Sequence, residues 1–259
     1  MITMKESVAI VTGASQGIGR SAAIRLARDF SAVVLVARDS EKLADTAVTV
    51  RASGAEPFAL ACDLSRPESA MTVVARTLER FERIDALLNI AGAVPQVDLF
   101  SMSDEAWDAG IALKFHGARR LALQAWEALK TSRGSLVFMS GSAAQSPKAA
   151  FAAVGAVNAA ILALAKAFAD RGRTDGVQVN SVLPGAVMTD RRRSYLAHWA
   201  PLHNATVEEA NKSFLAHAGI ERYGEPEEIA ELMAFLVSPK ARWMTGSAVR
   251  MDGGEISAI

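Results

Sequence analysis

The sequence predicts a single α/β domain built on a doubly wound, seven-stranded parallel sheet with helices on both faces. Short apolar runs alternate with longer segments in which apolar residues recur every three or four positions, the patterns of strands and amphipathic helices. The apolar runs contain few polar residues, as strands covered on both faces require. Strict alternation predicts right-handed crossovers and therefore a parallel sheet. A length of 259 residues suits one such domain, spanning 1–259.

Seven apolar runs are the expected strands. They are 7–12, 32–37, 57–62, 84–90, 134–140, 177–183 and 247–252. Helical periodicity fills the segments between them, including an amphipathic stretch from Trp107 to Lys130 and a nearly apolar one at 149–171. The one long stretch without clear periodicity covers about 186–220, and an insertion of that length in a compact domain is most often a lid or binding loop.

The composition argues against several classes of partner. The 28 Lys and Arg residues balance the 28 Asp and Glu residues, so no basic field attracts nucleic acid or a membrane surface. The first 15 residues do not resemble a secretion signal, which predicts a cytoplasmic protein. Asn158 and Lys166 interrupt the alanine-rich stretch, which favours a packed helix over a membrane span. The single cysteine, Cys62, is expected to be a buried, inert thiol.

A glycine-rich turn follows the first strand and leads directly into a helix. It reads Thr12-Gly13-Ala14-Ser15-Gln16-Gly17-Ile18-Gly19. Glycines allow a tight turn and let a pyrophosphate approach backbone N–H groups at the positive end of the helix. Three glycines alone are typical of many turns, but the strand before and the helix after them indicate a dinucleotide site.

This turn and four further segments resemble the short-chain dehydrogenase/reductase family, and the resemblance covers essentially the whole chain. The segments are Asp63-Leu64, Asn89-Ile90-Ala91-Gly92, Asn180 to Gly185 with Val187 and Thr189, and Met251-Asp252-Gly253-Gly254. In the family they contact the adenine, the adenosine ribose and the nicotinamide amide, and form a C-terminal signature. The resemblance implies a Rossmann-type cofactor site formed by Gly13, Ser15, Gln16, Gly17, Ile18, Gly19, Asp63, Leu64, Asn89, Ala91, Gly92, Pro184, Gly185, Val187 and Thr189.

The end of the second strand predicts NADP rather than NAD as the cofactor. Relatives that bind NAD have an acidic residue here, which holds the ribose 2′-hydroxyl. The present chain has Ala37 followed by Arg38, whose guanidinium suits bidentate contact with a 2′-phosphate.

The catalytic residues of the family do not stand where the resemblance would place them. The family uses a Tyr, a Lys four residues later, a Ser about a dozen residues before the Tyr, and an Asn on the preceding long helix. The corresponding positions are Val154, Asn158, Gly141 and Lys114. If the two helices pack as they do in the family, Lys114 lies opposite Asn158, and the family's Lys–Asn contact is kept with its two members exchanged. The alternative is that both residues have changed without constraint in a site that is no longer used, with Lys114 directed to solvent.

Other residues leave further alternatives open. Ser140 or Ser142 could take the place of the family's serine, or both could only form the turn. Tyr195 could reach the site from the lid. The run Arg191-Arg192-Arg193 could hold a carboxylate or phosphate, or form a solvated surface. His198 and His203 have no acidic or cysteine ligand at metal spacing, so no metal is expected.

The sequence therefore predicts an NADP-dependent oxidoreductase acting on a small carbonyl, alcohol or activated alkene, with Lys114, Asn158 and Ser140 or Ser142 forming an altered site. The contrary hypothesis is a non-catalytic NADP-binding sensor or partner subunit that lost the proton donor. Members of the resembled family assemble through two long helices, which implies a homodimer or homotetramer.

Overall fold

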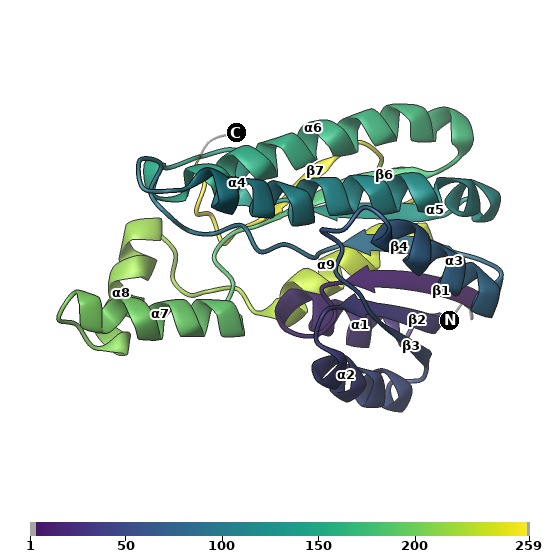
Figure 1. The fold of residues 1–259 in the computed structure, drawn as a ribbon, viewed down its shortest axis with the longest axis horizontal. Coiled ribbons are helices and arrows are strands. Elements are labelled where there is room, and N and C mark those ends of the chain that lie inside the picture. Colours follow the sequence, from purple (N-terminus) through teal and green to yellow (C-terminus); the bar gives the residue numbers. More distant parts are fainter. Residues whose placement is uncertain (1–3, 258–259) are drawn as a thin grey trace.

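The computed structural model describes residues 4–257, and its centre is a seven-stranded parallel sheet with the order β3-β2-β1-β4-β5-β6-β7 (Figure 1). The strands are β1 (Met4–Thr12), β2 (Phe30–Ala37), β3 (Glu56–Ala61), β4 (Ala86–Asn89), β5 (Ser135–Met139), β6 (Gln178–Pro184) and β7 (Ala248–Met251). Every neighbouring pair is parallel. All seven predicted strands and the doubly wound sheet are confirmed.

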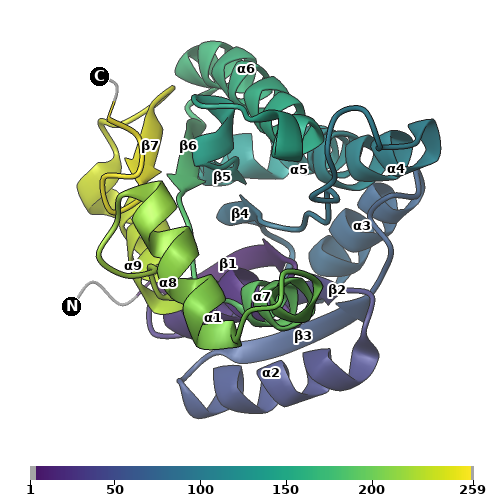
Figure 2. The ribbon, with the colours of Figure 1, turned by 90° about the vertical axis from the view of Figure 1, so that its left-hand side faces the viewer.

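Helices cover both faces of this sheet (Figure 2). One face packs against α1 (Gly17–Leu26), α2 (Ser40–Ala52) and α9 (Pro226–Val237). The other packs against α3 (Ser69–Phe81), α5 (Ala118–Ser132) and α6 (Ala152–Asp175). Alternate residues of one strand serve opposite cores: Val11 belongs to the first and Ile10 to the second. Burial on both sides explains why the strand sequences are almost entirely apolar.

The expected amphipathic helix from Trp107 to Lys130 is not one regular element. It comprises α4 (Asp104–Gly110), a π-helical segment η1 (Ile111–Gly117) and α5. Ser103 caps α4 by accepting a hydrogen bond from the backbone N–H of Ala106. A π-helical segment inside an α-helix shifts the direction of the side chains that follow, and it is frequent at functional sites. Lys114 lies in this segment.

The stretch expected as an irregular lid loop is largely helical, which corrects the sequence-based interpretation. It forms α7 (Asp190–Leu202) and α8 (Val207–Ala218), which extend beyond the sheet in Figure 1. Thr189 caps α7, and Thr206 with Glu209 forms a capping box at the start of α8. Leu196, Ala200 and Ala210 join the two helices in a small apolar core of their own.

The alanine-rich segment Ala149–Asp175 is, by length and composition, apolar enough to cross a membrane, although a core helix of a soluble protein passes the same test. Its buried residues, including Ile161, Ala165 and Ala169, join the core beneath β5 and β6. Its opposite face carries exposed small residues, among them Ala159 and Ala163.

Candidate functional site: a dinucleotide pocket and a buried lysine centre

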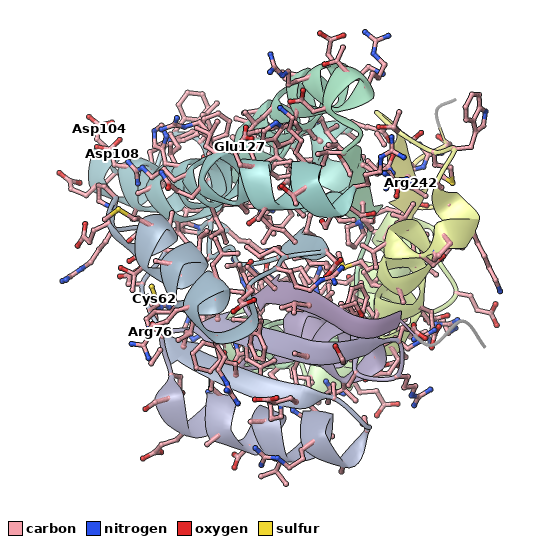
Figure 3. The ribbon with its side chains drawn as sticks, turned by 90° about the vertical axis from the view of Figure 1, so that its right-hand side faces the viewer. Cys62, Arg76, Asp104, Asp108, Glu127 and Arg242 are labelled. Carbon is pink, nitrogen blue, oxygen red and sulfur yellow. The ribbon has the colours of Figure 1, made fainter. Side chains whose placement is uncertain are left out.

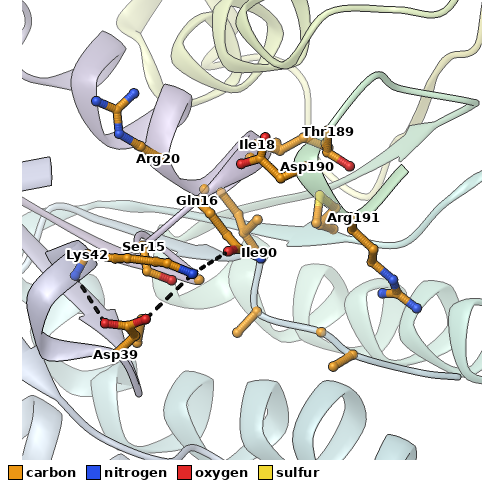
Figure 4. A pocket seen from close by; sticks show the side chains of 18 of the residues that line it. Ser15, Gln16, Ile18, Arg20, Asp39, Lys42, Ile90, Thr189, Asp190 and Arg191 are labelled. Carbon is orange, nitrogen blue, oxygen red and sulfur yellow. Dashed lines mark hydrogen bonds and ion pairs between the residues drawn. The ribbon is translucent and has the colours of Figure 1, made fainter. Parts of the chain in front are cut away.

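A large pocket opens at the carboxyl ends of β1 and β4, where the direction of strand order reverses. Ligands of doubly wound sheets bind at this point. The pocket has a volume of about 1130 Å³, and its walls come from the glycine-rich turn, the ends of β2 and β4, η1 and the start of α7 (Figure 4).

The glycine-rich turn forms a cradle that a side chain would fill. Gly13 has φ +70°, and a Cβ added to Gly19 would lie 2.1 Å from the Gly13 carbonyl oxygen. The N-terminus of α1 has no side-chain cap from Gln16, so its backbone N–H groups are available to an anion. The Thr12 hydroxyl accepts hydrogen bonds from the backbone N–H groups of Ile90 and Ala91, at 2.8 and 2.9 Å, and so ties this turn to the end of β4. These features fit a dinucleotide pyrophosphate.

Most of the predicted cofactor residues line the pocket. They are Gly13, Ser15, Gln16, Gly17, Ile18, Gly19, Arg38, Leu64, Ala91, Gly92, Gly185, Val187 and Thr189. Three others do not line it. The Asp63 carboxylate accepts hydrogen bonds from the backbone and hydroxyl of Ser65, which lower its pKa; Asn89 and Pro184 are buried beside the pocket.

The expected 2′-phosphate site includes a residue that sequence reasoning missed. Arg38 lies exposed at the end of β2, and Lys42 of α2 also lines the pocket. The Lys42 ammonium lies 3.6 Å from the Asp39 carboxylate and donates to the Gln16 side chain at 3.3 Å (Figure 4). Lys42 lies in the first turn of α2, beyond the strand-end positions on which the sequence-based prediction of the 2′-phosphate site rested.

The single thiol differs from the sequence-based expectation. Cys62 is half-buried rather than fully buried, and it lines the pocket next to Leu64. Figure 3 labels Cys62 at the edge of the sheet. It follows the last residue of an edge strand, where one side of the backbone has no further strand to cover it.

Lys114 and Asn158 are joined by a direct hydrogen bond. The Lys114 ammonium donates to the Asn158 side-chain oxygen at 2.5 Å and to the Ser140 carbonyl oxygen at 3.1 Å. Asn158 is only 2% exposed, whereas Lys114 remains partly accessible. A charged lysine has three N–H donors, so one remains after these two bonds.

Two glycines make room for this pair. A Cβ added to Gly92 would lie 2.9 Å from Cδ of Lys114, and a Cβ added to Gly141 would lie 2.7 Å from the side-chain nitrogen of Asn158. Contacts this short do not occur between real Cβ atoms and their neighbours. By resemblance, Gly141 occupies the position of the family's serine. A serine at this position would collide with the Asn158 side chain in its present orientation.

Burial lowers the pKa of Lys114 to about 8, and the positive charge of Arg191 contributes to this lowering. The ammonium is surrounded by neutral acceptors, and no ion pair in residues 4–257 involves it. A lysine with this pKa exchanges its proton near neutral pH and can serve as an acid or a base.

Neither candidate serine lines the pocket, and neither do Lys114 and Asn158. The Ser140 hydroxyl donates to the backbone carbonyl of Asn158 at 2.9 Å, and the Ser142 hydroxyl donates to the Glu255 carboxylate at 3.3 Å. Ser140 therefore binds both members of the pair through its backbone and side chain, and fixes the distance between β5 and α6.

An apolar wall stands where the resemblance places the tyrosine. Val154 packs with Val94, Ala153, Val157 and neighbouring apolar side chains of α4 and η1. Arg191 extends across from α7, and its guanidinium donates to the Val94 carbonyl oxygen at 2.5 Å. Helix α7 thus contacts the loop after β4 beside these apolar side chains.

Helix α7 contributes several pocket residues, some of which the sequence analysis left as alternatives. Arg191, Arg192, Ser194 and Tyr195 all line the pocket. The Arg192 guanidinium lies over the rings of Tyr195, Phe214 and Tyr223, at 5.6, 5.9 and 5.5 Å from their centroids. His198 and His203 do not line it, and residues 4–257 contain no group of three His, Cys, Asp or Glu residues that could hold a metal ion.

Comparison with known proteins agrees with this architecture. A family model described as enoyl-(acyl carrier protein) reductase matches residues 13–255. The chain belongs to the short-chain dehydrogenase/reductase family. A short-chain reductase protein, NovJ, of Streptomyces niveus is 30% identical over 96% of this chain and 94% of its own length. A putative ketoacyl reductase of Streptomyces coelicolor is also 30% identical, over 98% of both chains.

Solved structures of short-chain reductases have the same fold. The L-sorbose reductase of Gluconobacter frateurii, complexed with NADPH and L-sorbose, superimposes with a TM-score of 0.93 at 27% identity, over 98% of this chain and 97% of that one. An actinorhodin polyketide ketoreductase with NADPH gives 0.92 at 30% identity, over 98% and 99%. The chain thus belongs to a family of NAD(P)-dependent oxidoreductases.

Proposed function

We propose that the protein is an NADP-dependent reductase that acts on a small carbonyl compound or an activated alkene. Support for NADP comes from Arg38 and Lys42 at the 2′-phosphate end of the pocket and from the NADPH or NADP bound in several structural neighbours. NADPH, when bound, supplies the hydride. The glycine-rich turn would hold its pyrophosphate, and Gly185, Val187 and Thr189 would face its nicotinamide end.

The main support for the proposal is the hydrogen bond that the Lys114 ammonium donates to the Asn158 side-chain oxygen. We infer that Val154 and Asn158 occupy the positions of the family's Tyr and Lys, and that Lys114 takes over proton donation. Asn158 and the Ser140 carbonyl hold two of the ammonium's N–H groups, which leaves the third for the substrate oxygen. Its pKa of about 8 matches general acid catalysis near neutral pH. Ser140 acts as a positioning residue through its bond to Asn158.

A panel of aldehydes, ketones and enones with NADPH tests this function, followed at the absorbance of the reduced cofactor. Lys114→Met is expected to lower kcat by about 10²-fold or more with little change in NADPH affinity, because positioned general acids contribute roughly that factor. Lys166→Met is the matched control, since Lys166 lies exposed on α6 and away from the pocket. Equal kcat in the wild type and Lys114→Met would refute Lys114 as the acid.

One observation favours a second candidate, a non-catalytic NADP-binding sensor or partner subunit. Val154 and its neighbours form an apolar wall where the family has its proton donor. This candidate predicts that the protein binds NADPH but does not oxidise it with any substrate of the panel. Turnover of any panel substrate that is lost in Lys114→Met would exclude it.

We also propose that the chain forms one domain over 1–259, with α7 and α8 as its lid, and that it is a cytoplasmic homodimer or homotetramer. The exposed face of α6 carries small residues such as Ala156, Ala159 and Ala163, which permit close approach of a second helix. Leu123 on α5 is 51% exposed. A monomeric mass in sedimentation equilibrium would contradict the assembly.

A further inference from the structure

Basic side chains gather at two separate parts of the pocket. Arg38 and Lys42 lie at the end of β2 and on α2, and Asp39 offsets part of their charge. Arg191 and Arg192 lie at the start of the lid helix α7, near Lys114. The ion pairs among residues 4–257 include neither of these arginines, nor Lys114, which does not itself line the pocket.

Arg191 leaves most of its hydrogen-bonding capacity unused. Its one hydrogen bond to a described residue runs to the Val94 carbonyl oxygen, although a guanidinium has five N–H donors. The side chain of Arg191 is accessible to solvent and lines the pocket. Partial burial by the surrounding protein lowers its pKa, and the positive charge of Arg192 contributes to this lowering. Figure 4 shows the side chain extending away from the neighbouring Asp190. Arg192 differs, because three aromatic rings surround it.

The charge of Arg191 also acts on Lys114, lowering its pKa. Two cations whose charges act on one another disfavour one another, and an anion between them would stabilise both. The phosphates of NADP already have sites elsewhere: the pyrophosphate at the N-terminus of α1 and the 2′-phosphate at Arg38. Positive charge at Lys114 and Arg191 therefore remains for a group on the substrate.

We propose that the substrate is an oxo acid, a carbonyl compound whose carboxylate is bound by Arg191 while its carbonyl oxygen accepts a hydrogen bond from Lys114. The planar guanidinium matches a carboxylate in a bidentate contact. This assignment rests on the proposed reductase function. The carbonyl carbon gains a hydride from NADPH, which is oxidised to NADP⁺, and the oxygen gains the proton of Lys114, which water restores; the product is a hydroxy acid.

Binding measurements test the assignment without requiring turnover. Isothermal titration of the NADP⁺-saturated protein compares 2-oxobutanoate, 3-oxobutanoate and 4-oxopentanoate with their methyl esters, which keep the carbonyl and remove the charge. At least one acid is expected to bind about tenfold or more tightly than its ester. Arg191→Met is expected to abolish this difference. Arg193→Met is the matched control, because Arg193 is exposed on the same helix and does not line the pocket.

A salt titration of the wild type provides a second measurement that needs no variant. Raising the ionic strength from about 50 mM to about 500 mM should weaken binding of the acid and leave the ester unchanged. Three results would overturn the assignment. They are equal affinity for acids and esters, no binding of any of the three acids, and a difference in affinity between acid and ester that remains in Arg191→Met. A tenfold loss of NADPH affinity in Arg191→Met, together with lost discrimination, would make Arg191 a cofactor residue and overturn it as well.

The outcomes separate this inference from the proposed function. Acid binding that depends on Arg191, without NADPH oxidation, would support the ligand class and refute the reductase. Oxidation of NADPH by neutral ketones, with oxo acids reduced no faster than their methyl esters in the wild type, would support the reductase and refute the oxo acid.

Discussion

Replacing Lys114 by methionine is expected to change how the stability of the protein depends on pH. Burial lowers the pKa of Lys114 from 10.5 to about 8 in the folded state. Between these two values the unfolded chain binds more protons than the native state, so the free energy of unfolding of the wild type rises with pH. Below pH 8 both states are protonated, and the native state carries the full cost of the desolvated charge. Above 10.5 both states are neutral, and that cost is absent.

The size of the effect follows from the difference in pKa. A difference of about 2.5 units at ~1.4 kcal/mol per unit gives roughly 3 kcal/mol across the window as an upper value. The partial accessibility of Lys114 to water reduces it, so we expect roughly 2 kcal/mol. Methionine also leaves the acceptors on Asn158 and Ser140 without their donor, which costs about 1–3 kcal/mol at every pH. Only the first contribution varies with pH.

Urea unfolding of the wild type and Lys114→Met at intervals between pH 7 and pH 10.5 measures this difference. The stability of the wild type relative to the variant should grow by roughly 2 kcal/mol, with most of the change above pH 8. Lys166→Met, which removes an exposed ammonium, should stay parallel to the wild type. Parallel curves for Lys114→Met within about 0.5 kcal/mol would refute the reasoning, because they would mean that Lys114 keeps an ordinary pKa.

Three further substitutions probe the pocket. Arg38→Ala should weaken NADPH binding by about 10- to 100-fold, the value of a charge-assisted hydrogen bond, and leave NADH binding unchanged in fluorescence titrations; equal losses for both cofactors would contradict a 2′-phosphate site. Gly19→Ala should lower NADPH affinity by at least about tenfold, because its Cβ would lie 2.1 Å from the Gly13 oxygen, and wild-type affinity would show that the turn is adaptable. Gly141→Ser should displace Asn158 and destabilise the fold by about 1–3 kcal/mol in urea unfolding; an unchanged midpoint would argue against the tight contact.

Several features were predictable from the sequence because they depend on local chemistry. The strands follow from apolar runs such as 32–37, and the pyrophosphate cradle from Gly13, Gly17 and Gly19 in a strand-turn-helix context. The segment at about 186–220 was expected to be irregular, but it forms α7 and α8. The two helices are capped by Thr189 and Thr206, whose capping patterns were present in the sequence, while α7 lacks a clear apolar periodicity.

The sequence by itself determined the sheet, the cofactor turn and the positions of Lys114 and Asn158, because strand pattern, turn chemistry and motif order are encoded within short segments. Tertiary structure alone decided that the two side chains bond directly, that Gly92 and Gly141 leave space for them, and that Arg191 crosses to Val94. These contacts join residues 44 and 97 positions apart. Their distances and the lowered pKa of Lys114 depend on how helices pack over the sheet and exclude water, which no local pattern specifies.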